Sequence, residues 1–194
     1  MARQIAYNPQ ELRADVLQSF WAKGYAETSL SDLEEATGLN RRQLYNGIGD
    51  KRAMFFQAMD DFADTAGRRF LSALESPEAG LAEIETLLMT FVALSQQEDG
   101  RLGCMICSAS QEEVAADPDA ARRIEKYFLR IRAAYSNALS RAVERGEVVL
   151  GPNAIETRAD ALFGTHVALC ILGRAGRPDE QLEHMARQAV ADIA

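Results

Sequence analysis

Apolar residues at helical spacing are the feature that most constrains the fold of this chain. Leu12, Val16 and Phe20 share one helical face, and comparable runs follow as far as the C-terminus. We find no convincing period-two run typical of a strand, and no hairpin dipeptide between apolar segments. The sequence therefore predicts an all-α protein.

Glycine, proline and capping residues divide this pattern into separate helices. Gly24 and Gly38 suit helix ends, whereas Pro9, Pro118 and Pro152 suit first turns. We expect helices over residues 9–23, 30–37, 41–46, 51–70, 80–97, 103–116, 118–144 and 152–173, and a last one from 179 onward. The first fifty residues thus hold three short helices, and longer ones follow.

The second and third short helices are joined by the tight turn Gly38-Leu39-Asn40. Two short helices joined in this way form a helix-turn-helix, whose second helix can enter the DNA major groove. We expect a helix-turn-helix DNA-binding domain over residues 1–50. A larger helical ligand-binding and dimerisation domain is expected over residues 51–194.

The third helix begins with Arg41, Arg42 and Gln43, while Leu39 and Leu44 are expected to anchor it to the helices behind. Arginine can bond guanine in a bidentate way, and glutamine can do the same with adenine. Taken alone, this basic cluster is also compatible with an ordinary solvated face. Its place in a helix-turn-helix favours contact with base edges.

Phosphate contacts are expected around the same helix. Backbone N–H groups at the helix starts near Ser29 and Asn40 suit phosphate oxygens, and Lys51 is placed for another phosphate. Residues 1–55 carry seven basic and seven acidic groups, and the rest carries fourteen and twenty-two, so 14 − 22 = −8 is the whole net charge. Because exposed charges are screened within about 10 Å, an acidic body does not prevent DNA binding.

The N-terminal segment also resembles a known family. Residues 20–55 read FWAKGYAETSLSDLEEATGLNRRQLYNGIGDKRAMF, which is similar to the N-terminal domain of TetR-family transcriptional regulators, and the resemblance spans roughly residues 12–56. It implies DNA-facing positions, with Tyr45 and Lys51 on phosphates; the set is Thr28, Arg41, Gln43, Tyr45 and Lys51. Gly47 and Ile48 depart from the family's usual bulky and aromatic residues.

The last two helices are expected to form the interface of a homodimer. Residues 159–172 are apolar on almost every side, and the final helix carries one apolar stripe that includes Leu182, Ala186 and Ile193. We expect the stripe and the spare face of the preceding helix to meet a second copy. An internal core is the alternative.

The resemblance implies a small-molecule effector bound in the larger domain. Adaptable or aromatic side chains on its helices are candidates for the pocket, although such residues also form ordinary cores; they are Phe62, Met89, Phe91, Cys104, Met105, Tyr127, Phe163 and His166. For His166 a satisfied core position is the alternative to a ligand-binding or pH-sensing role.

The three cysteines, Cys104, Cys107 and Cys170, do not suggest a secreted disulfide framework. Cys104 and Cys107 form a Cys-x-x-Cys in helical context, where a lowered thiol pKa would make a redox sensor. Buried small hydrophobic residues are the alternative. With two histidines, neither at the customary spacing, we expect no zinc site.

Nothing in the sequence predicts catalysis or a cofactor. We find no glycine-rich phosphate loop, no Gly-x-Ser-x-Gly and no Glu-x-x-His pair, and adjacent Glu112 and Glu113 diverge on a helix. Because no apolar run is long enough for a membrane span, we expect a cytoplasmic protein.

The sequence thus predicts a homodimeric transcriptional regulator, most simply a repressor that a small-molecule effector releases from a pseudo-palindromic double-stranded DNA operator. Two alternatives stay open. One is a helical small-molecule-binding or protein-interaction module that does not read an operator, and the other is a thiol-based redox sensor.

Overall fold

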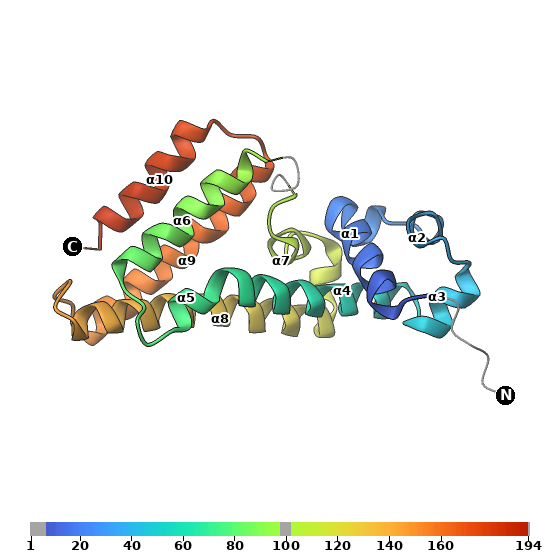
Figure 1. Cartoon of the computed structure of the whole chain (residues 1–194), viewed down its shortest axis with the longest axis horizontal. Coiled ribbons are helices and arrows are strands. Elements are labelled where there is room, and N and C mark those ends of the chain that lie inside the picture. The colour runs from blue at the N-terminus through green and yellow to red at the C-terminus, as the bar shows by residue number, and fades with distance from the viewer. Residues whose placement is uncertain (1–6, 98–101, 194) are drawn as a thin grey trace.

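The computed structural model describes residues 7–97 and 102–193. Within these ranges every regular element is helical and no strand occurs, so the predicted all-α class is confirmed. The molecule is elongated, with the first three helices at one end and the C-terminal helix at the other (Figure 1).

The N-terminal end consists of α1 (Pro9–Glu27), α2 (Leu30–Thr37) and α3 (Arg41–Gly47). Leu33 and Leu44 are fully buried against apolar residues of α1, as the helical spacing predicted. Gly24 interrupts α1 with φ +83°, and the chain then makes one more turn to Glu27. The predicted break is therefore a kink within α1.

Helix α4 (Lys51–Ala66) leads from this end into the larger domain and packs on both α1 and α8. It continues through a π-helical turn, η1 (Gly67–Leu71), into α5 (Ser72–Glu75). The sequence predicted the long helix but not its π turn. Such turns occur frequently at functional sites.

The larger domain is built from α6 (Leu81–Ser95), α8 (Pro118–Glu144), α9 (Pro152–Arg174) and α10 (Asp179–Ala191). Helix α8 runs beside α4 along the length of the molecule, and α6, α9 and α10 lie toward the C-terminal end (Figure 1). The predicted bounds of α8 are confirmed.

The expected single helix over residues 103–116 is wrong. This segment forms α7 (Met105–Ala109) and a short 3-10 helix, η3 (Glu113–Ala116). Ser110 Oγ and Gln111 Nε2 both donate to the carbonyl of Cys107, at 2.8 and 3.0 Å. Such bonds from side chain to backbone compete with continued helix and favour a turn.

Part of the apolar stripe of α10 packs within the chain, while Met185, Ala189 and Val190 of the same stripe stay half-buried, so its contact with a second copy remains a prediction. Leu182, Ala186 and Ile193 are buried within the chain, where α10 packs on α6 and α9. The outer face of α9, by contrast, is open to solvent, because Ala161 and Gly164 are exposed. An added Cβ at Gly164 would meet nothing within 4 Å.

Candidate nucleic-acid interface and ligand cavity

Two capping boxes fix the helices of the candidate DNA interface. Ser29 Oγ accepts from the backbone N–H of Asp32 at 3.1 Å, and the Asp32 carboxylate accepts from the N–H of Ser29 at 2.7 Å. At α3, Asn40 Oδ1 accepts from Gln43 N at 3.1 Å, and Gln43 Oε1 accepts from Asn40 N at 3.0 Å. These reciprocal bonds satisfy N–H groups that a helix start leaves unpaired.

The predicted base-reading residues are exposed on the first turn of α3. Arg41 and Arg42 are both open to solvent, and Gln43 is half-buried. Glu34 accepts from the N–H of Arg41 at 2.6 Å and lies 3.8 Å from its guanidinium. Gln43 Oε1 already accepts from Asn40 N in the capping box, so in a bidentate contact with adenine this oxygen would accept from both Asn40 and the base.

Tyr45 and Lys51 flank the same surface. Tyr45 is 43% exposed, and the ammonium of Lys51 lies 4.6 Å from the centroid of the Tyr25 ring. This cation–π contact holds Lys51 at the start of α4. An added Cβ at position 47 would lie 2.5 Å from Tyr7 Oη and 3.0 Å from Leu12 Cδ2, so these side chains would have to shift to admit it.

Thr28 requires a correction. Its side chain is fully buried, and its hydroxyl donates to the carbonyl of Gly24 at 2.6 Å. The side chain therefore holds the kinked end of α1 and is not presented to DNA. Threonine is a common residue at the start of a helix, but Thr28 instead follows the end of α1 and bonds back to Gly24.

A cavity of about 570 Å³ lies between α1, α4, α6, α8 and α9. Phe62, Cys104, Tyr127 and His166 line it, as does Phe91. Of the other predicted pocket residues, Phe163 packs its ring on Phe128 at 5.4 Å, while Met89 packs on the core and Met105 is buried. None of these three lines the cavity, because helical spacing shows which side is buried but not which neighbour it meets.

His166 is both a satisfied core residue and part of the cavity wall. It is 2% exposed, with Nδ1 lying 3.2 Å from the hydroxyl of Tyr135. Burial lowers the pKa of His166 to about 3, so the ring is neutral near pH 7. A protonation switch at physiological pH is therefore not supported.

The three cysteines are buried and adjoin one another beside the cavity. The contact of Cys104 with Cys107, followed by burial, raises the pKa of Cys104. Cys104 in turn lowers the pKa of Cys107, but the contact with Cys170 and burial outweigh this and raise it. Because a reactive thiol needs a lowered pKa, the small-hydrophobe interpretation is favoured.

Glu112 links the larger domain to the kink of α1. Its carboxylate accepts from the backbone N–H groups of Tyr25 and Ala26, at 2.8 and 3.1 Å. The kink at Gly24 leaves these N–H groups without helical partners, and a Cβ at Gly24 would lie 2.6 Å from Glu112 Oε1. Glycine at this position thus allows the carboxylate to approach.

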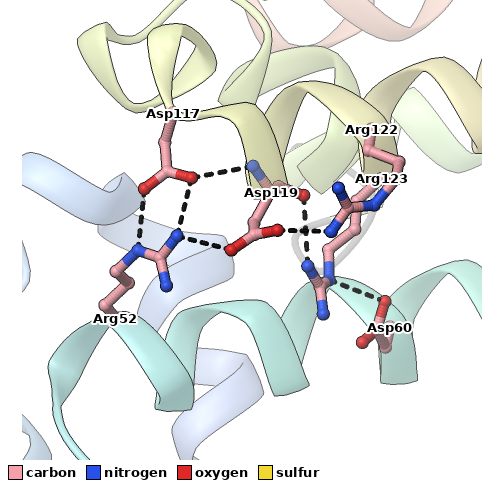
Figure 2. A network of polar contacts seen from close by, with 6 residues as sticks. All are labelled: Arg52, Asp60, Asp117, Asp119, Arg122 and Arg123. Atoms are coloured by element: carbon pink, nitrogen blue, oxygen red, sulfur yellow. Dashed lines mark hydrogen bonds and ion pairs between the residues drawn. The ribbon is translucent and has the colours of Figure 1, made fainter.

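A second polar link joins the start of α4 to the start of α8 (Figure 2). Arg52 donates two bonds to Asp117, at 2.7 and 2.8 Å, and one to Asp119 at 2.7 Å. Arg123 donates to Asp60 on α4 at 3.0 Å. Asp117 also caps α8 by accepting from Asp119 N at 2.8 Å, so one carboxylate serves both helices.

The stretch of chain that leads to Glu112 begins at Leu102 and Gly103, which are bonded to residues of α1 and α9. Trp21 Nε1 donates to the carbonyl of Gly103 at 2.9 Å, and Arg174 donates to the carbonyl of Leu102 at 2.7 Å. Trp21, Leu102 and Gly103 all line the cavity. The chain that leads to Glu112 therefore starts in the cavity wall.

Comparison with known proteins gives a consistent result. No protein-family model matches the chain. It is 25% identical over 183 residues to the uncharacterized HTH-type transcriptional regulator YezE of Bacillus subtilis (strain 168), covering 94% of each protein. It also resembles a cysteine mutant of the TetR family transcriptional regulator CifR, complexed with 26-bp double-strand operator DNA, with a TM-score of 0.87, 19% identity and 97% and 98% of the two chains covered.

A TetR transcriptional regulator from Chloroflexus aurantiacus J-10-FL gives a TM-score of 0.79, with 23% identity and 95% of each chain covered. The chain therefore has the fold of the TetR-family transcriptional regulators. The TetR fold accounts for the division into a helix-turn-helix end and a larger helical body. It also confirms the fold that the resemblance of residues 12–56 implied.

The described part of this TetR-fold chain holds no cluster of three or more His, Cys, Asp or Glu side chains suited to a metal ion. None of its described helices has the length and apolar character needed to cross a membrane. Glu112, Arg52 and Arg174 were not predicted from the sequence. Their partners lie far away along the chain, and charged side chains carry no periodic signal.

Proposed function

We propose that this protein is a sequence-specific DNA-binding transcriptional regulator, and not an enzyme, acting in the cytoplasm as a repressor. The observation that carries the proposal is the placement of α3 at one end of the molecule. A reciprocal capping box of Asn40 and Gln43 fixes its first turn, which exposes Arg41 and Arg42. Similarity to YezE and to operator-bound CifR supports the same function.

The active form is a homodimer that reads two half-sites of a pseudo-palindrome. The open outer face of α9 supports this arrangement, since Ala161 and Gly164 leave room for a close approach. Ile171 on the same helix is 37% exposed. Two recognition helices related by a two-fold axis then contact successive major grooves.

A small-molecule effector occupies the cavity and weakens operator binding. The cavity wall at Gly103 continues into α7 and η3, and from there Glu112 contacts α1 and Asp117 contacts Arg52 on α4. An effector that shifts this segment thus changes the placement of both helices that carry the DNA-binding end. A coupling of about 5–150-fold in affinity is normal for such a switch.

The first experiment is selection of bound duplexes from a random DNA library at about 0.15 M salt, near physiological ionic strength. A two-fold-symmetric site is the expected result. Failure to enrich any sequence, both at this salt and at low salt, contradicts operator reading.

Single substitutions then separate base contacts from phosphate contacts. Arg42→Ala is expected to cost about 1–3 kcal/mol on the selected site and to relax base preference, whereas Lys51→Ala weakens all sequences alike and lowers the salt slope by about 1. Lys126→Ala, an exposed lysine of α8, is the matched charge control and is expected to change neither. Equal losses on selected and random DNA for Arg42→Ala would refute its role.

A further inference from the structure

The charge of the cavity wall is unusual for an acidic protein. The chain has a net charge of −8, yet no Asp or Glu lines the cavity among the described residues. Arg69 is the charged side chain in that lining. An amine or guanidine ligand would therefore meet a like charge there, and no carboxylate among the described residues would balance it.

Arg69 is held at the cavity by the π-helical turn η1. Its guanidinium lies 5.1 Å from the centroid of the Phe70 ring, and Phe70 also lines the cavity. Thr65, one turn earlier on the same helix, lines it too. Arg69 makes no ion pair with any other described residue, whereas Arg130, on the facing helix α8, is paired with Glu75. Arg69 lines the cavity and is exposed to solvent, so an anion can reach its guanidinium.

The rest of the wall suits a flat apolar body. The rings of Trp21 and Phe62 meet edge to face with centroids 5.2 Å apart, and Phe62 meets Tyr127 at 6.3 Å. Phe91 lies 5.4 Å from Phe70 and 4.4 Å from the ring of His166. These rings already contact one another edge to face or tilted, and together they give the cavity an aromatic, apolar wall against which another apolar group can pack.

His166 adds a neutral polar group to this wall. Because Nδ1 faces the hydroxyl of buried Tyr135, the ring's other nitrogen is left for a ligand. His166 is therefore a neutral hydrogen-bonding group, and it gives the cavity no second cation.

We infer that the cavity binds an apolar aromatic monoanion, with its carboxylate or equivalent acid group against Arg69 and its body between Trp21, Phe62 and Phe91. The volume of about 570 Å³ suits one such molecule. This inference names the effector class for the proposed function and depends on that function only for the consequence at the operator.

Trp21, the single tryptophan of the chain, is a built-in reporter because it lines the cavity. Three probes with the same body and different charge are titrated against its fluorescence: phenylhexanoate, phenylhexanol and phenylhexylamine. Each is tested on the full chain and on the variants Arg69→Gln and Arg68→Gln. Arg68 is exposed on the same turn but does not line the cavity, so it is the matched control.

The expected result is that phenylhexanoate binds about tenfold or more tightly than the alcohol, and that the amine binds most weakly. Arg69→Gln is expected to abolish the preference for the acid, whereas Arg68→Gln keeps it. Equal affinities for the three probes, equal losses in both variants, or no change of Trp21 fluorescence with any probe would overturn the inference. Aromatic rings also bind cations, so preference for the amine would overturn it as well.

This experiment is independent of the operator selection. A selected operator together with failure of all three probes would leave the DNA-binding function standing and remove only the effector class. Binding of the acid probe without any enriched operator would leave the ligand class standing and remove the DNA-binding function.

Discussion

The link between Glu112 and the kink of α1 gives the sharpest prediction. In Glu112→Ala, the backbone N–H groups of Tyr25 and Ala26 lose the carboxylate oxygen that accepts from them at 2.8 and 3.1 Å. The kink at Gly24 prevents the helix from supplying a substitute acceptor. The end of α1 is then joined to the larger domain by fewer bonds.

The size of the effect follows from the surroundings of the two bonds. A hydrogen bond to a charged group contributes about 1.5–3 kcal/mol net. The bond to Ala26 is exposed, so water replaces it at small cost, whereas the bond to Tyr25 is partly buried. We therefore expect a total loss of about 1–3 kcal/mol, mostly from Tyr25.

Two measurements test this value. Urea unfolding is expected to show the loss with an unchanged denaturant slope, and hydrogen exchange of the Tyr25 amide is expected to speed up by about 10–100-fold, the same free energy. Glu113→Ala is the matched control, because Glu113 is exposed and its side chain makes no hydrogen bond within the described residues. Unchanged exchange at Tyr25 in Glu112→Ala would refute the link.

Three further predictions concern the core, the link at α4 and the dimer. Burial lowers the pKa of His166 to about 3, so as pH falls below the ordinary value of 6.5 the unfolded chain takes up the proton before the folded chain does, and stability is lost. His166→Gln should flatten this loss in urea unfolding, with His184→Gln at an exposed position as the control. The hydrogen bonds from Arg52 lower the pKa of Asp117 to about 2, so the stabilisation is present above its ordinary value near 3.8 and lost as pH falls through 2. Arg52→Gln should return the Asp117 titration, followed by carboxyl NMR, toward the ordinary value, and an unchanged titration would contradict the pairing. Gly164→Leu should yield monomers in sedimentation with unchanged circular dichroism, whereas a dimer that persists would move the interface away from α9.

Local signals explain which elements could be predicted from the sequence. The bounds of α8 follow from Asp117 and Pro118 at its start and Gly146 just beyond its end, all within a few residues of the helix. The recognition helix was predictable for the same reason, since the capping pair Asn40 and Gln43 lies at its first turn.

Long-range contacts explain what could not be predicted. Gly103 bonds to Trp21, and Glu112 to Tyr25, across more than eighty residues of sequence, and these contacts accompany the division of the predicted helix over 103–116. Thr28 was expected to face DNA because the family resemblance implied it, yet its burial depends on how α1 kinks at Gly24. The positions of Met89 and Phe163 outside the cavity likewise depend on helix packing.

The segment from Glu112 to Asp119 contacts α1 of the DNA-binding end and α4, which leads out of it, since Glu112 binds α1, and Asp117 and Asp119 bind Arg52 on α4. The chain that leads into this segment starts in the cavity wall at Gly103. Coupling between two binding sites is reciprocal, so whatever factor the effector removes from operator affinity, the operator must remove from effector affinity. Breaking either link should therefore reduce both factors equally, because the two ligands act on one shared segment.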